Sequence, residues 1–202
     1  MPIDTFLFDI GNVLLNFDFQ ITARRIAPLC GVPEEDILGR MDDLKVPLET
    51  GQLSGEDFLS TAASRLAFRG PPLELKRAFQ EIFTPNQAAI ELVETLCQQE
   101  YRMVILSNTN ALHAEYFLRE FPVFSRFQER VFSHDAGVMK PDSRIFMFAL
   151  ETLGLNPANT FYIDDLAPNI DAGRSLGFPS HLYQSEHHEA LLDSLRLLSV
   201  PV

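Results

Sequence analysis

The sequence predicts an α/β protein: a doubly wound, parallel β-sheet with a helical region inserted into it. In the second half of the chain, short apolar runs alternate with helical patterns, which is typical of parallel strands joined by helices. The first apolar run, residues 5–8, is too short for a buried helix and stops at Asp9. Residues 18–84 instead carry a period of three to four with no convincing strand. The chain therefore divides into a sheet-containing core and a helical insertion.

We expect the core to comprise residues 1–17 and 85–202 and the helical insertion to comprise residues 18–84. Glycine and proline clusters at 31–33 and 70–72 separate the helices of the insertion, because neither residue continues a helix well. No internal repeat or low-complexity segment interrupts the pattern. The sequence thus predicts that the insertion is a small helical unit connected to the core at two points.

The core elements follow from the same alternation. Pro141 suits the first turn of a helix, where its missing N–H is not needed, and Gly154 suits the position just after a helix. After the first strand, we expect strands at 102–106, 131–133, 160–163 and 181–183, and helices at 86–99, 111–120, 141–153, 168–176 and 186–198.

Composition excludes several classes of protein. The chain has 202 residues, of which 46% are apolar, so it can bury a substantial core. A formal charge of -12 repels nucleic acid and anionic membranes, so we expect neither as a partner. The N-terminus lacks the basic start and apolar core of a signal peptide, and no apolar stretch approaches a membrane span, which predicts a cytoplasmic protein. Cys30 and Cys97 have no metal-binding spacing, so any metal ligands must be oxygens or nitrogens.

Polar residues stand where the predicted strands end. Open α/β sheets bind ligands outside the carboxyl ends of their strands, so one site can collect these residues. A lysine in the loop before residue 141 provides the positive charge. The candidate site residues are Asp9, Gly11, Ser107, Asn108, Lys140, Asp164 and Asp165.

Three of these candidates are carboxylates. Brought together, Asp9, Asp164 and Asp165 would repel one another unless a cation lay among them. An all-oxygen ligand set favours Mg²⁺, which keeps several waters and accepts a phosphate oxygen. One oxygen of Asp9 can bind the metal while the other attacks phosphorus, giving an aspartyl-phosphate that water hydrolyses.

The remaining candidates suit phosphate. Ser107 and the main-chain amide of Asn108, at the start of a helix, can bind the oxygens of a transferring phosphoryl group. Lys140 can offset the clustered negative charge of nucleophile and phosphate, which is the central electrostatic problem of phosphoryl transfer. We therefore interpret Asp9 and Lys140 as catalytic residues, and Ser107, Asn108 and Lys140 as substrate-binding residues.

Four motifs in this order resemble the haloacid dehalogenase-like (HAD) superfamily of aspartate-nucleophile phosphatases, over nearly the whole chain. The resemblance implies a Rossmann-like core, a small helical cap that closes over the substrate, and Mg²⁺ as cofactor. It also implies that Asp165 binds the metal directly and that Asp164 supports it. The motifs are Phe8-Asp9-Ile10-Gly11-Asn12-Val13, Leu106-Ser107-Asn108-Thr109, Lys140-Pro141, and Asp164-Asp165 followed by Asn169.

Gly11 departs from the family pattern, which has a second aspartate two residues after the nucleophile. In the family, that residue binds metal through its backbone carbonyl, which Gly11 retains, and protonates the leaving group through its side chain, which Gly11 lacks. The glycine form most resembles bacterial glucose-1-phosphate phosphatase-like members, and more distantly the phosphatase domain of soluble epoxide hydrolases. His113 is either a substitute acid or a packed helix histidine.

The expected function is a Mg²⁺-dependent phosphatase that hydrolyses a small phosphate monoester, a sugar phosphate above all. Its partner would be a small phosphorylated metabolite. Three alternatives are considered: a metal-independent 2-haloacid dehalogenase, a phosphate-receiving signalling domain, and a non-catalytic protein that binds a phosphate ligand. A signalling domain would need its acidic pair directly after the first strand and would have no helical insertion. The adjacent Asp164 and Asp165 argue against the dehalogenase, because without a metal they have no counterion. The residues that read the substrate are expected within 41–51, and the sequence does not indicate the oligomeric state.

Overall fold

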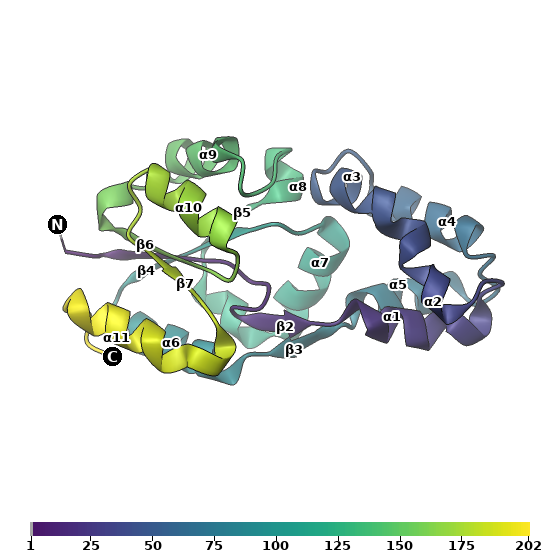
Figure 1. The fold of residues 1–202 in the computed structure, drawn as a ribbon, viewed down its shortest axis with the longest axis horizontal. Coiled ribbons are helices and arrows are strands. Elements are labelled where there is room, and N and C mark those ends of the chain that lie inside the picture. Colours follow the sequence, from purple (N-terminus) through teal and green to yellow (C-terminus); the bar gives the residue numbers. More distant parts are fainter. Residues whose placement is uncertain (1) are drawn as a thin grey trace.

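The computed structural model describes residues 2–202 and has a five-stranded, all-parallel sheet at its centre (Figure 1). The strand order is β5-β4-β1-β6-β7, so the direction of winding reverses at β1. This confirms the predicted doubly wound sheet. The strands are β1 (Thr5–Phe8), β4 (Arg102–Ser107), β5 (Glu129–Phe132), β6 (Thr160–Asp164) and β7 (Ser180–Leu182).

The register of the central strands brings their ends together. Phe8, the last residue of β1, pairs with Ile105 of β4 on one side and with Ile163 of β6 on the other. The backbone N–H of Asp9 then donates to the carbonyl of Ile163 at 3.0 Å. Asp9 therefore lies between the carboxyl ends of β4 and β6, at the point where the strand order reverses.

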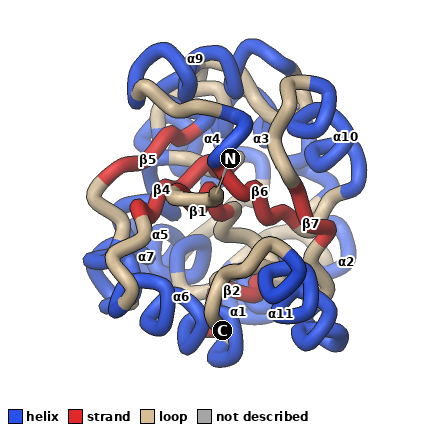
Figure 2. Tube along the Cα trace, turned by 90° about the vertical axis from the view of Figure 1, so that its left-hand side faces the viewer, coloured by secondary structure: helices blue, strands red, loops and turns tan. Residues whose placement is uncertain are grey.

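Helices cover both faces of the sheet (Figure 2). Alternation along β1 sends Phe6 and Phe8 into one apolar cluster and Leu7 into another. All three are fully buried, and each contributes about 1.5–3 kcal/mol of hydrophobic stabilisation. Helices α6 (Gln87–Gln98), α7 (Ala111–Glu120) and α11 (His188–Leu197) supply the first cluster, and α9 (Ser143–Leu153) and α10 (Ala167–Ser175) supply the second.

Five helices from the insertion gather around an apolar cluster of their own, at the right of Figure 1. The cluster includes Ile26, Phe58 and Leu66, and it takes in Leu112 from α7 of the core. Ser54 caps the helix that begins at Gly55, since its hydroxyl accepts the Asp57 N–H at 3.0 Å. These helices are α1 (Phe19–Ile26), α2 (Glu34–Ile37), α3 (Lys45–Glu49), α4 (Gly55–Arg65) and α5 (Pro72–Gln80).

A two-stranded antiparallel ribbon, which the sequence did not indicate, connects the insertion to the core. It pairs β2 (Leu15–Phe17) with β3 (Phe83–Pro85). Each strand has three residues, too few for a repeating pattern to stand out. The ribbon lies at both ends of residues 18–84, and the division into core and cap at these positions stays a prediction.

The helices are short, and two of them begin two residues later than predicted. The helix expected from Pro141 begins at Ser143, because the Asp142 carboxylate caps it by accepting the Arg144 N–H at 2.9 Å. The last helix starts at His188, after a 3₁₀ turn over 185–187. Within residues 2–202, no helix combines the length and the apolar character needed to cross a membrane.

Candidate active site

A cavity of about 340 Å³ opens at the carboxyl ends of β1, β4 and β6. The carboxyl ends of the core strands line one side of the cavity. Phe17 of the ribbon and Phe19, Lys45 and Glu49 of the insertion also line it. Six of the seven candidate site residues line this cavity; they are Asp9, Gly11, Ser107, Asn108, Lys140 and Asp165.

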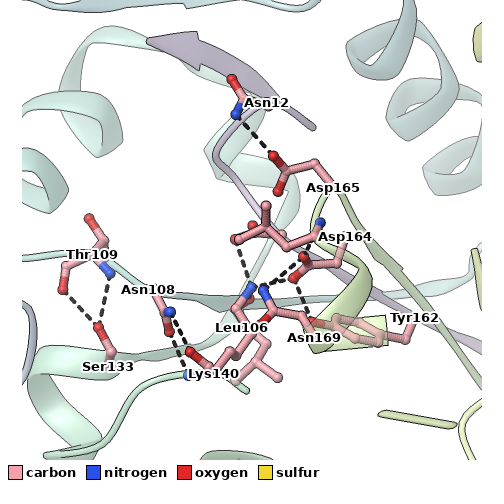
Figure 3. A network of polar contacts seen from close by, with 12 residues as sticks. Asn12, Leu106, Asn108, Thr109, Ser133, Lys140, Tyr162, Asp164, Asp165 and Asn169 are labelled. Atoms are coloured by element: carbon pink, nitrogen blue, oxygen red, sulfur yellow. Dashed lines mark hydrogen bonds and ion pairs between the residues drawn. The ribbon is translucent and has the colours of Figure 1, made fainter. Parts of the chain in front are cut away.

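The seventh candidate, Asp164, is fully buried beneath the cavity. Figure 3 shows the side chains that converge on its carboxylate, and four donors occupy its two oxygens. A carboxylate with this many partners is held in one orientation. Asp164 is thus the anchor of the polar network below the cavity. The donors are Lys140 Nζ at 2.6 Å and Tyr162 Oη at 2.5 Å to Oδ2, and Asn169 Nδ2 and the Leu166 N–H, both at 2.9 Å, to Oδ1.

Lys140 is buried with its ammonium between two carboxylates. Its Nζ donates to Asp164 and to the Leu106 carbonyl at 2.8 Å, and it lies 3.0 Å from Asp9 Oδ1 as an ion pair. Burial opposes the charged form, but the charges of Asp9 and Asp164 outweigh it and raise the pKa of Lys140. The side chain therefore carries a fixed positive charge beside Asp9.

Asn108 fixes the loop that carries Lys140. Its Nδ2 donates to the Lys140 carbonyl at 2.9 Å, and its Oδ1 accepts the Lys140 N–H at 2.8 Å (Figure 3). The next residue, Thr109, is held in turn by the Ser133 hydroxyl, which accepts its N–H at 2.9 Å and donates to its carbonyl at 3.0 Å. The Asn108 side chain thus positions Lys140, in addition to any phosphate binding by its amide.

Asp9 lines the cavity and is 7% exposed, but its carboxylate oxygen Oδ1 is buried. Among the described residues, Oδ1 has the Lys140 ion pair at 3.0 Å but accepts no hydrogen bond of good geometry. Burial raises the pKa of Asp9 to about 6, although the charge of Lys140 opposes this shift. A buried carboxylate oxygen without a hydrogen bond is costly unless a ligand or an ion completes it.

Asp165 completes an acidic cluster on the cavity side. Oxygens of Asp9, Asp164 and Asp165 lie within 4.8 Å of one another, close enough to hold one metal ion. Asn12 donates to Asp165 Oδ2 at 2.9 Å and so orients it. Burial raises the pKa of Asp165 as well. The oxygen-only donor set suits Mg²⁺ better than a transition metal.

Gly11 leaves the site without a carboxylate at that position, and a neighbouring ring fills the space. A β-carbon built on Gly11 would lie 3.0 Å from Cε1 of Phe17. Phe17 comes from β2 and lines the same cavity. The wall where an acid would stand is therefore aromatic.

His113 is a packed histidine and not a substitute acid. Its backbone N–H donates to Asn110 Oδ1 at 3.0 Å, which leaves Asn110 Nδ2 to donate to the ring Nδ1 at 3.0 Å. The ring Nε2 then donates to the Phe79 carbonyl at 3.1 Å, and the ring stacks on Phe79 with centroids 4.4 Å apart. Burial lowers the pKa of His113 to about 4, so the ring is neutral at pH 7 and has no acidic proton to give.

Sequence reasoning missed Asn12 and Tyr162. Asn12 has a positive φ of 53°, a left-handed conformation that asparagine tolerates better than most residues. Tyr162 stands two residues before Asp164 in β6, so the two side chains point to the same face. A phenolic hydroxyl two positions before Asp164 in the same strand was the available signal.

Comparison with known proteins identifies the class. A profile of haloacid dehalogenase-like hydrolases matches residues 3–177. D-ribitol-5-phosphate phosphatase from Bacteroides thetaiotaomicron is 25% identical over 87% of this chain and 89% of its own length. The phosphorylated carbohydrates phosphatase from Thermotoga maritima is 25% identical over 85% of this chain and 80% of its own.

A solved structure shows the same fold. It is a HAD family enzyme from Bacteroides thetaiotaomicron in complex with magnesium and inorganic phosphate, with a TM-score of 0.83 and 22% identity over 94% of this chain and 98% of that one.

The fold and the site thus define a doubly wound α/β protein with an acidic cluster at the switch point of its sheet. The chain belongs to the haloacid dehalogenase-like hydrolases. Membership of the glucose-1-phosphate phosphatase branch stays a prediction.

Proposed function

We propose that this protein is a Mg²⁺-dependent phosphatase that hydrolyses small phosphate monoesters of sugars or polyols. One observation carries the proposal: Asp9 lines the cavity, and its carboxylate lies 3.0 Å from the buried Lys140 ammonium and beside Asp164 and Asp165. The relatives that act on ribitol phosphate and on phosphorylated carbohydrates support the substrate class.

The reaction proceeds in two displacements at phosphorus. A carboxylate oxygen of Asp9 attacks the phosphorus, and the bond from phosphorus to the ester oxygen breaks. The departing alkoxide takes a proton from water, since Gly11 has no side chain to give one. Water then attacks the aspartyl-phosphate and breaks its bond to the Asp9 oxygen, which releases inorganic phosphate and restores the carboxylate.

The chain's own groups hold the phosphate against this nucleophile. Lys140 neutralises charge that gathers on the phosphoryl oxygens, and Asp164 and Asn108 keep its ammonium in place. Ser107 ends β4 at the cavity, where its hydroxyl can donate to the same phosphoryl group. A fixed arrangement of donors lowers the barrier because it needs no reorganisation during the reaction.

Mg²⁺ fits the acidic cluster. Three carboxylates within 4.8 Å of one another repel unless a cation lies among them, and the ammonium of Lys140 is already shared between Asp9 and Asp164. Asp9, Asp165 and the Gly11 carbonyl would hold the ion, with Asp164 supporting them from below. When bound, Mg²⁺ would neutralise charge on the phosphate and orient it.

The helical insertion, residues 18–84, acts in this proposal as the cap over the substrate. Lys45 and Glu49 from α3 line the cavity together with the strand ends of the core. A volume of about 340 Å³ lies near the lower end of ligand pockets, which suits a small metabolite.

A screen of phosphate esters with and without Mg²⁺, beside 2-haloacids, tests the proposal. We expect Mg²⁺-dependent phosphate release from sugar or polyol esters, no halide release, and loss of turnover in Asp9→Asn with an unchanged circular dichroism spectrum. Halide release without metal would instead establish the dehalogenase. Phosphatase activity retained by Asp9→Asn would refute the covalent mechanism.

A further inference from the structure

We propose that Lys45 and Glu49, on helix α3, bind the hydroxyl groups of an uncharged, polyhydroxylated leaving group and so determine substrate specificity. This inference rests on the proposed function, and it concerns the residues that recognise the leaving group of the substrate.

Lys45 and Glu49 line the catalytic cavity from the insertion, whereas the strand ends line it from the core. Lys45 begins α3 and Glu49 ends it, so they stand one helical turn apart on one face of the helix. Both line the cavity whose floor carries Asp9 and Lys140. A phosphate held at Asp9 would therefore direct its ester group toward α3.

Helix α3 is fixed against the core just beyond its end. Gly51 has a left-handed φ of 69°, and a β-carbon built there would collide with the carbonyl oxygen of His134 in α8 (Ser133–Ala136). Only glycine permits this close approach. Helix α3 also packs directly on α8, so Lys45 and Glu49 are held at a set distance from the core.

The pair is free to bind a ligand. Within residues 2–202, neither the Lys45 ammonium nor the Glu49 carboxylate has a hydrogen bond or an ion pair. Glu49 is half-buried, and burial raises the pKa of its carboxyl group while the charge of Lys45 opposes that shift. A half-buried carboxylate without a partner gains from a ligand that donates hydrogen bonds to it.

Hydroxyl groups match this pair better than a second anion does. An ammonium only donates hydrogen bonds and a carboxylate only accepts them, whereas each hydroxyl does both. Adjacent hydroxyls of a sugar or alditol can therefore engage Lys45 and Glu49 together. A second phosphate or a carboxylate would attract Lys45 but meet repulsion from Glu49.

A second cavity, of about 200 Å³, lies behind the pair, with Lys45 and Glu49 in its wall as well. Phe19 and His113 are also shared with the catalytic cavity, and apolar side chains of the insertion such as Met41 and Phe58 form much of the remaining lining. The two charged groups are thus the polar boundary between the catalytic cavity and a mainly apolar one. A leaving group with hydroxyls could hydrogen-bond to Lys45 and Glu49 at this boundary. An alkyl chain could form no hydrogen bond with either side chain.

Two esters of equal chain length and two matched variants test the proposal. The measurement is the ratio of kcat/KM for a pentitol phosphate to that for pentyl phosphate, which differ in hydroxyl groups alone. We expect the wild type to favour the pentitol ester, and Lys45→Met and Glu49→Gln each to lower the ratio at least about tenfold, as for loss of a hydrogen bond to a charged group. Turnover of pentyl phosphate should change by less than about threefold.

Exposed charges elsewhere on the insertion provide the controls. Arg40→Met and Glu35→Gln remove the same charges from positions that line neither cavity, and both should keep the wild-type ratio. A ratio unchanged in both cavity variants would overturn the inference. So would a wild-type preference for a bisphosphate that Lys45→Met alone abolishes, since Lys45 would then bind a second anion.

Equilibrium binding separates failure of this inference from failure of the proposed function. In an Asp9→Asn background, calorimetry measures pentitol phosphate binding with Mg²⁺ without turnover. Lys45→Met and Glu49→Gln should each weaken this binding about tenfold relative to the matched controls. Equal binding refutes the role of α3 even if the wild type is a phosphatase. Weakened binding without any wild-type hydrolysis would leave the hydroxyl-binding role standing and refute the catalytic one.

Discussion

Replacing Gly11 by aspartate tests how the enzyme works without a general acid. A positioned acid accelerates proton transfer roughly 10²- to 10⁴-fold, which corresponds to about 3 to 5 kcal/mol of barrier. The wild-type rate should therefore depend on how well the leaving group departs unprotonated. A sugar 1-phosphate, whose anomeric hydroxyl is more acidic than an ordinary alcohol, should react faster than the corresponding 6-phosphate, and an aryl phosphate faster still.

The structure sets the steric cost of the substitution. A β-carbon on Gly11 would lie 3.0 Å from Cε1 of Phe17, so the ring must move by a few tenths of an ångström. Phe17 is 38% exposed, and the contact is with the far part of its side chain. We therefore expect the ring to yield and the aspartate to enter the cavity. Gly11→Ala is the matched control, because it adds the same β-carbon without the carboxylate.

The assay measures kcat/KM over a series of esters with graded leaving-group pKa. The wild type and Gly11→Ala should both show a steep decline as the leaving group becomes less acidic. Gly11→Asp should raise the rates of the poorest leaving groups by up to about 10²-fold and barely change those of aryl esters. The interpretation that the general acid is absent because residue 11 is glycine would be refuted by either of two results. One is a wild-type kcat/KM that does not depend on leaving-group pKa, and the other is an equal gain in Gly11→Asp and Gly11→Ala.

Three further predictions concern the carboxylates and the buried histidine. Asp165→Asn should weaken Mg²⁺ binding in calorimetric titration more than Asp164→Asn does, and equal or reversed effects would contradict the assigned ligands. Asp164→Asn should instead lower the free energy of unfolding by about 3 kcal/mol in urea titrations, because an amide NH₂ in place of Oδ2 leaves the buried Lys140 ammonium and Tyr162 hydroxyl without this acceptor. Burial lowers the pKa of His113 from 6.5 to about 4 on folding. Between these two pH values, the unfolded chain therefore binds a proton that the folded protein does not. The free energy of unfolding should decrease by about 3 kcal/mol as the pH falls from 6.5 to 4. His113→Gln should lose this dependence, and an identical pH profile in both proteins would show that another group is responsible.

Much of the core could be predicted because its information is local. Each central strand is an apolar run that ends in a polar residue, and parallel strands in a doubly wound sheet place those ends together. The sequence alone was therefore enough to predict that Asp9 and Ser107 lie at one site. Helix α7 has the predicted bounds, since Asn110 caps it and an apolar face runs along it.

Other features depend on contacts between distant parts of the chain. The sequence shows two adjacent aspartates, but which one turns inward depends on Tyr162 and Asn169, which donate to Asp164 alone. The proximity of Phe17 to Gly11 follows from the short ribbon, which carries no repeating pattern. Lys45 comes to the cavity only because α3 packs on the core.

The charges around Asp9 explain why a divalent cation would stabilise the site. Three carboxylates, of Asp9, Asp164 and Asp165, converge with one ammonium, that of Lys140, and leave two net negative charges in largely buried surroundings. A phosphate dianion approaching that cluster would be repelled, because charge interactions are strong where water is excluded. One Mg²⁺ held there would neutralise the cluster. Lys140 alone could not do this, because its charge is already shared between Asp9 and Asp164. The same surplus of negative charge would also repel a haloacid carboxylate in a metal-free enzyme, which favours the phosphatase over the dehalogenase.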